Sequence, residues 1–432
     1  MRSEVREIEA SGRRSGRWPK CSLGAALLCA LVLVQGCGGS GGEDASSPAA
    51  AAPTSATLTP AALTPAASNV ASISVNGGLG GTVNLAFTSV TLCVPGSSNC
   101  QVIDNVLIDT GSSGLRIVAS ALAPSISLPQ QTDAKGDPVA QCAHFVDGYA
   151  WGSVKLADFK IAGERANSLP IQMIGDPKFP LVPGACAASG ASKNSVAELR
   201  ANGILGLAIF RQDCGAACQQ RARNAIYYTC PAAGCQMAAI PLALQLQHPV
   251  AMFAANNNGI AIELPSVPAS GAARLSGSLV FGIGTQANNA IGSASVFGVD
   301  SGTANFTTVY KGTSYSASFI DSGSNALFFA DAGTPVCTDA LAAGFYCPPV
   351  TKNLTATIQG RNGVSAQVNF SLGNASAMVQ SNPGFAVLGS LGAPAISANT
   401  FDWGLPFFYG RKVFIAIDGA STPAGVGPYI AF

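Results

Sequence analysis

The feature that most constrains the fold is a six-residue pattern that occurs once in each half of the chain. Two apolar residues precede an aspartate, a hydroxyl residue, a glycine and a serine, at residues 107–112 and again at residues 319–324. Each copy ends a run of β-forming residues. A glycine-containing apolar segment follows later in each half, at residues 203–207 and 401–405. The repeat therefore predicts two halves with similar folds.

Elsewhere the chain alternates short apolar stretches with turn-forming residues. From Val70 onward, Gly, Asn and Ser interrupt the apolar stretches about every eight to twelve residues, a spacing typical of antiparallel strands. Charged residues make up only 10% of the 432 residues, and the 49 glycines favour turns over long surface helices. We therefore expect an all-β protein. The expected strands include residues 73–75, 83–92, 101–108 and 154–161, and the best helical windows are residues 195–200, 239–247 and 338–343.

The N-terminal segment has the features of an export signal. Six basic residues within residues 1–20 precede an apolar run at residues 23–34, which is too short to span a bilayer stably. Residues 34–37, Val-Gln-Gly-Cys, resemble the lipobox of bacterial lipoproteins. We expect residues 1–36 to be a lipoprotein signal peptide and the thiol of Cys37 to carry lipid. The alternative is an ordinary secretory signal followed by an unrelated cysteine.

Residues 37–68 consist mainly of Gly, Ala, Ser, Pro and Thr, which cannot bury a core. This composition predicts a disordered tether between the lipid anchor and the globular part. Together, the signal and the tether predict a lipid-anchored protein of the bacterial cell envelope. We expect it at the outer membrane, facing the periplasm or the cell surface.

The cysteine count supports export. Of the 13 cysteines, Cys21 and Cys29 belong to the predicted signal and Cys37 to the predicted anchor, so ten remain. An even number in an oxidising compartment predicts five disulfides. Two of the expected pairs close short loops and one joins more distant residues: Cys93–Cys100, Cys337–Cys347 and Cys142–Cys186.

The remaining four cysteines, Cys214, Cys218, Cys230 and Cys235, lie close together in the sequence, and their pairing is left open. Four thiolates at such spacing can also form a tetrahedral zinc cage. Because thiolates rarely stay reduced outside the cytoplasm, disulfides are the preferred interpretation and no metal is expected.

The repeated segments resemble the two active-site loops of pepsin-like aspartic peptidases. Residues 109–115 resemble the first loop and residues 321–324 the second. Further matching segments follow in chain order: residues 202–208, 277–282 and 404–418. The resemblance implies a bilobal pepsin-like acid-protease fold, with two similar β lobes, residues 69–250 and 251–432, and a cleft between them.

In such a fold Asp109 and Asp321 would be the catalytic pair. Two carboxyl groups held about 3 Å apart cannot both ionise, so they share one proton and can act as base and acid together. The resemblance also implies supporting roles for six neighbouring residues. Gly111 and Gly323 would allow the backbone to approach the carboxylates closely, and Ser112 and Ser324 would hydrogen-bond to the outer carboxylate oxygens. Thr110 and Ser322 would join the two loops. The alternative for either Asp-x-Gly segment is a β-turn capped by its own carboxylate.

Residues 145–152 resemble the hairpin that covers the cleft in this family, called the flap. Phe145 stands where the family has Tyr, and Arg116 stands where it has Trp. Tyr149 or Trp151 could cover the cleft instead, or could pack within the hairpin. Arg116 could lower the pKa of a catalytic carboxyl. The expected flap and cleft residues are Arg116, Phe145, Asp147, Gly148, Tyr149 and Trp151.

These features lead to a functional hypothesis: a membrane-tethered aspartic endopeptidase that acts as a monomer on a peptide or protein substrate, without a cofactor. The net charge of +1 gives no field that would attract nucleic acid. His144 and His248, the two histidines, are expected to be structural. The alternatives are a catalytically silent pepsin-like lipoprotein with a binding or inhibitory role, and a structural envelope lipoprotein whose Asp loops only build turns.

Overall fold

The computed structural model describes residues 68–222, 225–395 and 397–432. The predicted signal peptide, the predicted anchor at Cys37 and the predicted tether up to residue 67 lie outside the described residues. Within the described part of the chain, no helix is long and apolar enough to cross a membrane. The described residues belong to one compact unit.

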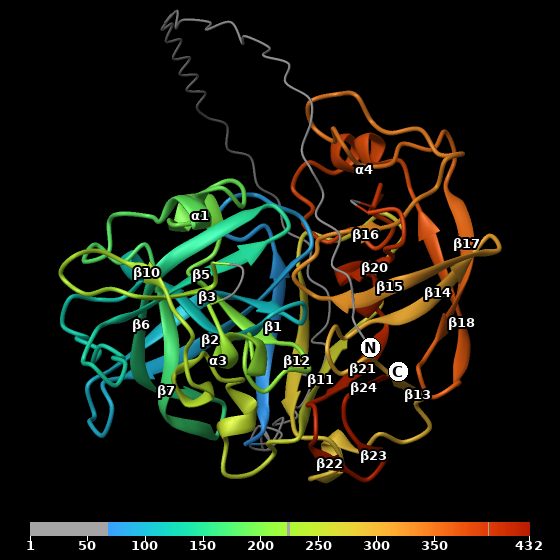
Figure 1. The fold of residues 1–432 in the computed structure, drawn as a ribbon. Helices are drawn as coiled ribbons and strands as arrows, with labels where there is room; N and C mark the ends of the chain where they lie inside the picture. Colours follow the sequence, from blue (N-terminus) through green and yellow to red (C-terminus); the bar gives the residue numbers. More distant parts are fainter. Residues whose placement is uncertain (1–67, 223–224, 396) are drawn as a thin grey trace, which may run out of the picture. The chain divides into compact units, whose positions relative to one another are not determined.

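The described chain is all-β, as predicted, and most of its strands belong to one 15-stranded sheet (Figure 1). The strands of this sheet, in the order in which they lie side by side, are β10 (Gln236–Met237), β9 (Tyr227–Thr229), β5 (Val139–Phe145), β6 (Gly148–Ile161), β7 (Glu164–Ile174), β4 (Ser113–Val118), β8 (Gly203–Leu207), β3 (Cys100–Asp109), β2 (Leu85–Cys93), β1 (Val70–Asn76), β12 (Leu275–Phe281), β11 (Gly259–Leu264), β21 (Arg411–Ala416), β24 (Tyr429–Ala431) and β13 (Val296–Gly298).

A second sheet of seven strands is built only from the second half of the chain. Its strands, in spatial order, are β18 (Ser365–Leu372), β17 (Lys352–Gln359), β14 (Phe306–Tyr310), β15 (Thr313–Asp321), β20 (Asp402–Gly404), β16 (Leu327–Phe328) and β19 (Gly392–Ala393). A small hairpin joins β22 (Ser421–Thr422) to β23 (Gly425–Val426). The helices are short: α1 (Gly184–Ala187), α2 (Val196–Leu199), α3 (Ala216–Gln220) and α4 (Ala375–Ser381), with 3-10 turns at Ala119–Ala121, Leu242–Leu244, Val250–Met252, Ala287–Asn289 and Leu405–Phe408.

The four strands predicted from sequence are confirmed, as parts of β1, β2, β3 and β6. The helical window at residues 195–200 is α2, whose N-cap Ser195 accepts a hydrogen bond from Glu198 N. The other two windows are wrong. Residues 239–247 form only a 3-10 turn, in which Gln245 bonds to the backbone instead of continuing a helix. Residues 338–343 form turns inside the short loop that the Cys337–Cys347 disulfide closes.

The predicted disulfide bonding is confirmed. Cys93–Cys100, Cys142–Cys186 and Cys337–Cys347 are bonded as expected. The four clustered cysteines, whose pairing the sequence left open, form Cys214–Cys218 and Cys230–Cys235. Since a disulfide sulfur is not a thiolate, this arrangement excludes the zinc cage for those four residues.

The two halves share a local strand arrangement around the repeated pattern. In the first half β3 runs parallel to β8, β8 pairs antiparallel with β4, and β4 runs parallel to β7. In the second half β15 runs parallel to β20, β20 pairs antiparallel with β16, and β16 runs parallel to β19. Asp109 lies opposite Gly206 and Asp321 opposite Gly404 in the matching registers. The sequence repeat is therefore also a structural repeat.

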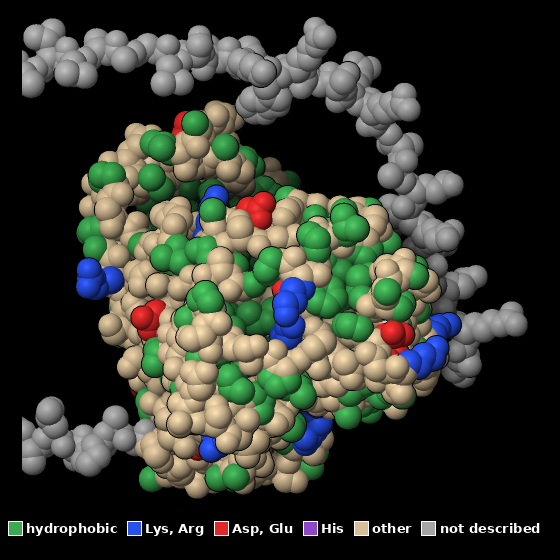
Figure 2. Space-filling view, turned by 90° about the vertical axis from the view of Figure 1, so that its left-hand side faces the viewer, with side chains coloured by type: hydrophobic (Ala, Val, Ile, Leu, Met, Phe, Trp, Pro, Cys, Tyr) green, Lys and Arg blue, Asp and Glu red, His purple; other side chains and the backbone are tan. Residues whose placement is uncertain are grey.

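The large sheet joins strands from both halves of the chain. β1 pairs antiparallel with β12 along six residue pairs, from Val70↔Val280 to Val75↔Leu275. β1 alternates buried and more exposed residues, whereas β4 and β8 are buried along their whole length because both of their faces are covered. Strands from both sides of the predicted boundary between residues 250 and 251 therefore belong to one sheet, and the division into lobes stays a prediction. On the face seen in Figure 2, charged side chains are scattered among uncharged ones.

Asn84 connects the start of β2 to the second half of the chain. Its amide donates to Asn325 O and Leu388 O, both at 2.9 Å, and its Oδ1 accepts from Leu388 N and Tyr409 OH, both at 2.8 Å. Asn84 is fully buried and has a φ of 55°, a conformation that asparagine tolerates better than most residues. Asn325 directly follows Ser324, so this side chain also supports the second repeated loop.

We expect the Asn84→Ala substitution to lower the free energy of unfolding by about 3 kcal/mol or more, because it leaves several buried groups without partners. Urea unfolding followed by circular dichroism measures this change. The matched control is Asn105→Ala, at a residue with a φ of 54° whose side chain makes no hydrogen bond among the described residues. Equal losses in the two variants would show that backbone strain, and not the amide network, is responsible.

Candidate active site

The loops that follow β3 and β15 lie against each other and are joined by four hydrogen bonds. Thr110 N donates to Ser322 Oγ (3.2 Å), and Ser322 N donates to Thr110 Oγ1 (2.9 Å). Each hydroxyl then donates to a backbone carbonyl of the other half: Ser322 Oγ to Ile108 O (2.8 Å) and Thr110 Oγ1 to Ile320 O (3.4 Å). Both hydroxyl residues are buried. The reciprocal pattern fixes the two loops relative to each other.

Each aspartate accepts two hydrogen bonds from its own loop. One comes from the backbone N–H of the glycine two residues later, and the other from the hydroxyl of the serine three residues later. The bonds are Gly111 N to Asp109 Oδ1 (2.8 Å), Ser112 Oγ to Asp109 Oδ2 (2.5 Å), Gly323 N to Asp321 Oδ1 (2.8 Å) and Ser324 Oγ to Asp321 Oδ2 (2.8 Å). These bonds orient both carboxyl groups.

The two glycines allow the carboxyl groups to approach from opposite loops. A Cβ at Gly111 would lie 2.9 Å from Asp321 Cγ, and a Cβ at Gly323 would lie 2.9 Å from Asp109 Oδ1. Any side chain at either position would therefore collide with the carboxyl group of the other half. Glycine is required at both places by this close approach.

Asp109 and Asp321 face each other across the two loops, since each carboxyl group lies against the glycine of the other loop. Burial, followed by the charge of Asp109 and a hydrogen bond to it, raises the pKa of Asp321 to about 8 from the ordinary 3.8. Asp109 is itself only 7% exposed. Two adjacent carboxyl groups in a poorly hydrated place hold one proton between them near neutral pH. Such a pair can accept a proton at one oxygen and donate one from another.

A third carboxyl group, Asp402 in β20, lies beside this pair and was not predicted as a site residue. It is 6% exposed, and its nearest ionisable neighbours are Asp321 and Asp109. Burial is the largest cause that raises the pKa of Asp402 well above its ordinary value, and the charge of Asp321 is the next. The signal was visible in the sequence as an acidic residue inside the otherwise apolar segment 401–405.

The predicted flap residues Phe145, Asp147, Gly148, Tyr149 and Trp151 lie on the β5–β6 hairpin. Tyr149 (8% exposed) and Trp151 (1% exposed) pack with Cys142, Cys186 and Tyr228. The Trp151 ring meets the Tyr228 ring edge-on at 5.1 Å, and its Nε1 donates to Phe179 O. These two aromatics therefore pack within the hairpin, which is one of the two alternatives from the sequence, and a cover role stays a prediction.

Residues outside the β5–β6 hairpin contact its tip. Exposed Asp147 forms an ion pair with Lys193 (2.6 Å), and a Cβ at Gly148 would lie 2.2 Å from Ala191 O. Phe145 is partly buried and packs in a small apolar cluster with Val118. The tip thus rests on residues 191–193.

Arg116 does not act on the aspartate pair in the way that we expected. Its guanidinium is buried, donates to Ser113 O (2.9 Å) and pairs with Asp213 (3.4 Å). Asp213 also accepts a hydrogen bond from Tyr227 OH (2.7 Å) and one from Gln141 Nε2. Burial raises the pKa of Asp213, and the charge of Arg116 offsets only part of this effect. The positive charge is therefore neutralised inside the first half.

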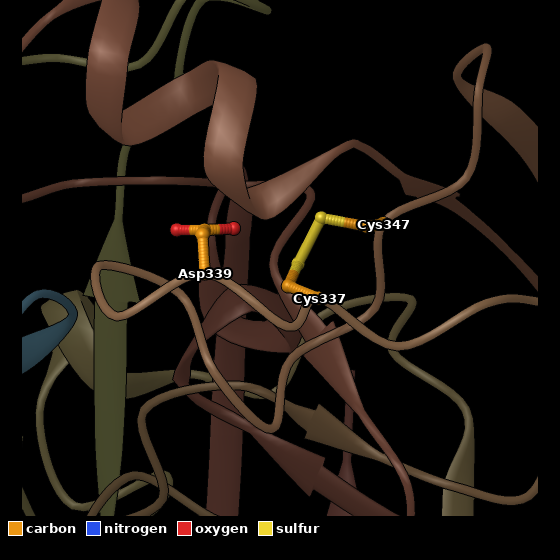
Figure 3. Close-up of side chains that lie close together, drawn as sticks. All are labelled: Cys337, Asp339 and Cys347. Atoms are coloured by element: carbon orange, nitrogen blue, oxygen red, sulfur yellow. A yellow bond between two sulfur atoms is a disulfide. The ribbon is translucent and has the colours of Figure 1, made fainter.

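One other group of potential ligands, Cys337, Asp339 and Cys347, lies together in the described chain (Figure 3). The two sulfurs are bonded to each other, and Asp339 accepts hydrogen bonds from Ser376 and from the backbone of Leu341. The carboxylate closes a turn, so these residues do not make a metal site.

The two histidines lie apart from the aspartates. His144 lies on β5 with its side chain exposed, and partial desolvation lowers its pKa. His248 is 1% exposed, its Nδ1 accepts from Val250 N, and burial lowers its pKa to about 4. His248 is a structural residue that stays neutral through most of the acid range.

The fold and the site together define an all-β protein with a buried pair of aspartates, each supplied by one half of an internal repeat. The chain belongs to the family described as "Protein of unknown function (DUF3443)", whose family model matches residues 65–432. No curated protein matches the chain in sequence.

The Asp321 carboxyl makes stability depend on pH in a defined direction. Its pKa is about 8 in the folded chain against an ordinary 3.8, so the unfolded chain binds fewer protons between these values and stability falls as pH rises. We expect Asp321→Asn to remove a slope of up to about 1.4 kcal/mol per pH unit in this window. Chemical denaturation between pH 4.5 and 7.5 (~3 units, within the window) measures it.

The control is Asp104→Asn, an exposed aspartate on the same strand as Asp109. His248 titrates with the opposite sign in every variant, so the informative quantity is the difference between variant and wild type. Parallel stability curves for wild type and Asp321→Asn would contradict the shared-proton arrangement.

The Arg116–Asp213 pair predicts a second stability effect. Arg116→Met leaves the Asp213 carboxylate buried without its partner, so we expect a loss of about 3–5 kcal/mol in urea unfolding. The double variant with Asp213→Asn should recover most of that loss. Arg361→Met removes an exposed pair with Asp300 (side chains 60% and 36% exposed) and should cost less than about 1 kcal/mol. A double variant as unstable as Arg116→Met would refute the charge explanation.

Proposed function

We propose that this protein is an aspartic endopeptidase with a bilobal pepsin-like fold, in which Asp109 and Asp321 activate water for peptide hydrolysis. The observation that carries the proposal is the meeting of two equivalent loops, each of which presents one carboxyl group to the other. Four features of these loops support it: the adjacent carboxyls, the raised pKa of Asp321, the serine hydroxyls and the reciprocal Thr110–Ser322 bonds. A β-turn role for either aspartate would require none of the contacts between loops.

The chemistry of such a pair uses one proton twice. The ionised carboxyl accepts a proton from a water molecule as the water oxygen attacks the amide carbon, while the protonated carboxyl donates its proton to the carbonyl oxygen. The resulting gem-diol breaks down when the carboxyl that took the water proton donates it to the amide nitrogen, the C–N bond cleaves, and the other carboxylate accepts a proton from a gem-diol hydroxyl. One carboxyl then holds a proton and the other is ionised, as at the start. No covalent intermediate is needed.

The proposed context follows from the sequence. A lipid at Cys37 would hold the enzyme at the outer membrane, and residues 37–68 would let the two β lobes reach their substrate. The proposed substrate is a peptide or protein in extended conformation, bound by a monomer through backbone hydrogen bonds and apolar pockets.

One observation favours a second candidate function, a catalytically silent binding protein. Tyr149 and Trp151 are buried in the hairpin, and Phe145 has no hydroxyl to bond across a cleft. An aspartic peptidase needs a cover that excludes water from its pair. If no part of the hairpin performs that role, the same pair would bind a peptide without cleaving it.

The test is cleavage of a diverse peptide mixture by the purified protein between pH 3 and pH 7 (~4 units, spanning the ordinary carboxyl range and beyond). We expect Asp109→Asn and Asp321→Asn each to lower the cleavage rate by about 1,000-fold or more, because neither carboxyl can replace both roles. Asp104→Asn, the exposed control on β3, should cleave as wild type does.

Mass spectrometry of the products, with and without the transition-state analogue pepstatin, measures the outcome. Cleavage that persists in both variants would refute the mechanism. Binding of peptides by wild type without cleavage would support the silent module.

A further inference from the structure

A second pocket, on the surface of the first half, is formed by residues other than the aspartate loops. Its volume is about 520 Å³, which is within the range of small-molecule binding sites. Two loops, residues 178–183 and residues 230–235, enclose it together with Lys155 of β6. None of its lining residues belongs to β3, to β15 or to the loops that follow these strands. The pocket is therefore separate from the candidate active site.

The pocket lies on the face of the β5–β6 hairpin that carries Trp151. Side chains alternate between the two faces of a strand, so Lys155 shares its face with Trp151. Phe179 of the pocket wall packs against the buried cluster that contains Trp151, and Trp151 Nε1 donates to Phe179 O (3.0 Å). Phe145 belongs to a different cluster on the other face. A ligand in the pocket would thus contact the side of the hairpin opposite to Phe145.

The walls of the pocket are mostly apolar and offer few hydrogen-bond donors. Four of the lining residues are prolines, which have no backbone N–H: Pro138, Pro180, Pro183 and Pro231. The side-chain amide of Gln130 already donates to three backbone carbonyls. The side-chain donors that the lining residues leave to a ligand are the ammonium groups of Lys155 and Lys178.

The charges at the pocket favour an anion. Lys155 Nζ lies 3.6 Å from Asp176 Oδ2, and Asp176 also accepts hydrogen bonds from Ser153 Oγ and from Lys178 N. No acidic residue lines the pocket itself, and within the described part of the chain Lys178 forms no ion pair. One carboxylate therefore stands against two ammonium groups, which leaves one positive charge for a ligand to neutralise.

The walls are fixed by covalent and hydrogen bonds. The Cys230–Cys235 disulfide closes one loop, and Cys230 N donates to Pro138 O (2.8 Å). The strands beside the pocket, β5, β6 and β9, have a paired neighbour on each side, so a peptide could not bind there by adding a strand. A preformed site of this kind loses little conformational freedom when it binds a compact molecule.

We propose that this pocket binds a small apolar molecule that carries one carboxylate group. Lys155 and Lys178 hold the carboxylate, and Phe179 and the proline rings contact the hydrocarbon part. Leu181, which is 83% exposed and lines the pocket, is covered by the bound ligand. The proposal does not depend on the peptidase function, because the two sites share no residue.

Calorimetric titration of the purified protein with octanoate tests the proposal. We expect saturable binding at one site, and affinities at least about tenfold weaker for 1-octanol and for octylammonium, which have the same chain without the negative charge. Equal affinities for octanoate and 1-octanol would overturn the proposal. So would the failure of both octanoate and the more rigid 2-naphthoate to bind at millimolar concentration.

Charge substitutions at one exposed residue separate binding from folding. Leu181→Lys and Leu181→Asp remove the same apolar contact and, at an exposed residue, should both fold. We expect Leu181→Lys to bind octanoate about tenfold more tightly than Leu181→Asp. Lys178→Met should weaken binding about tenfold, whereas Arg361→Met, which removes an exposed cation of the second half, should bind as wild type does. Equal affinities in the two Leu181 variants would refute the role of charge.

Methyl resonances of leucine and valine locate the bound octanoate. Its addition should shift the signals of Leu181 and Val182 and leave those of Val350 and Val426 in place, because these two exposed valines lie outside the pocket. Equal shifts at all four residues would show unspecific association with exposed hydrocarbon and would overturn the proposal.

Discussion

The rest of the structure depends on the close approach of two carboxyl groups that come from distant parts of the chain. Two ionised carboxylates about 4 Å apart repel each other by about 4 kcal/mol at an effective dielectric constant of 20, and burial adds to that cost. The fold offsets the cost in two ways. The raised pKa of Asp321 leaves one proton on the pair, and the reciprocal bonds of Thr110 and Ser322 hold the loops together. Gly111 and Gly323 carry no Cβ, which at either position would collide with the opposite carboxyl group.

That local arrangement is maintained by long-range pairing. β3 and β15 reach the site from two different sheets, and each is held in register by a strand, β8 or β20, that arrives much later in the sequence. The side-chain amide of Asn84 holds the start of β2 against the segment that follows Ser324, because all four of its hydrogen bonds go to groups of the second half. An internal repeat alone would produce two similar loops without placing them next to each other. The β1–β12 pairing and the Asn84 network bring them to one place.

The sequence predicted what depends on short segments and missed what depends on distant partners. The strands, the repeated pattern and three disulfides could be predicted because residue type and spacing determine them locally. The helices predicted at residues 239–247 and 338–343 do not form, because side-chain hydrogen bonds from Gln245 and the Cys337–Cys347 disulfide stabilise turns there despite the apolar periodicity. Arg116 was predicted to lie near the aspartate pair because its true partner, Asp213, is remote in sequence. No local sequence pattern indicates a buried ion pair of this kind. Asp402 is the opposite case: an acid within an apolar segment was visible in the sequence, but only the fold shows that it lies beside the paired carboxyl groups.

The repeat also explains where the two halves were free to differ. At one register position across the central strands, the first half has Arg116 opposite Ile204 and the second has Phe328 opposite Asp402. Each half therefore contains one ionisable and one apolar residue there, but on opposite strands. The arginine lies on the strand that leaves the loop, where Asp213 neutralises it. The aspartate lies on the crossing strand, where its nearest ionisable neighbours are the paired carboxyls. An added negative charge at that place would oppose ionisation of the pair, and the same repulsion raises the pKa of Asp402. The first half thus accommodates its buried ionisable residue by an ion pair, and the second half by a raised pKa.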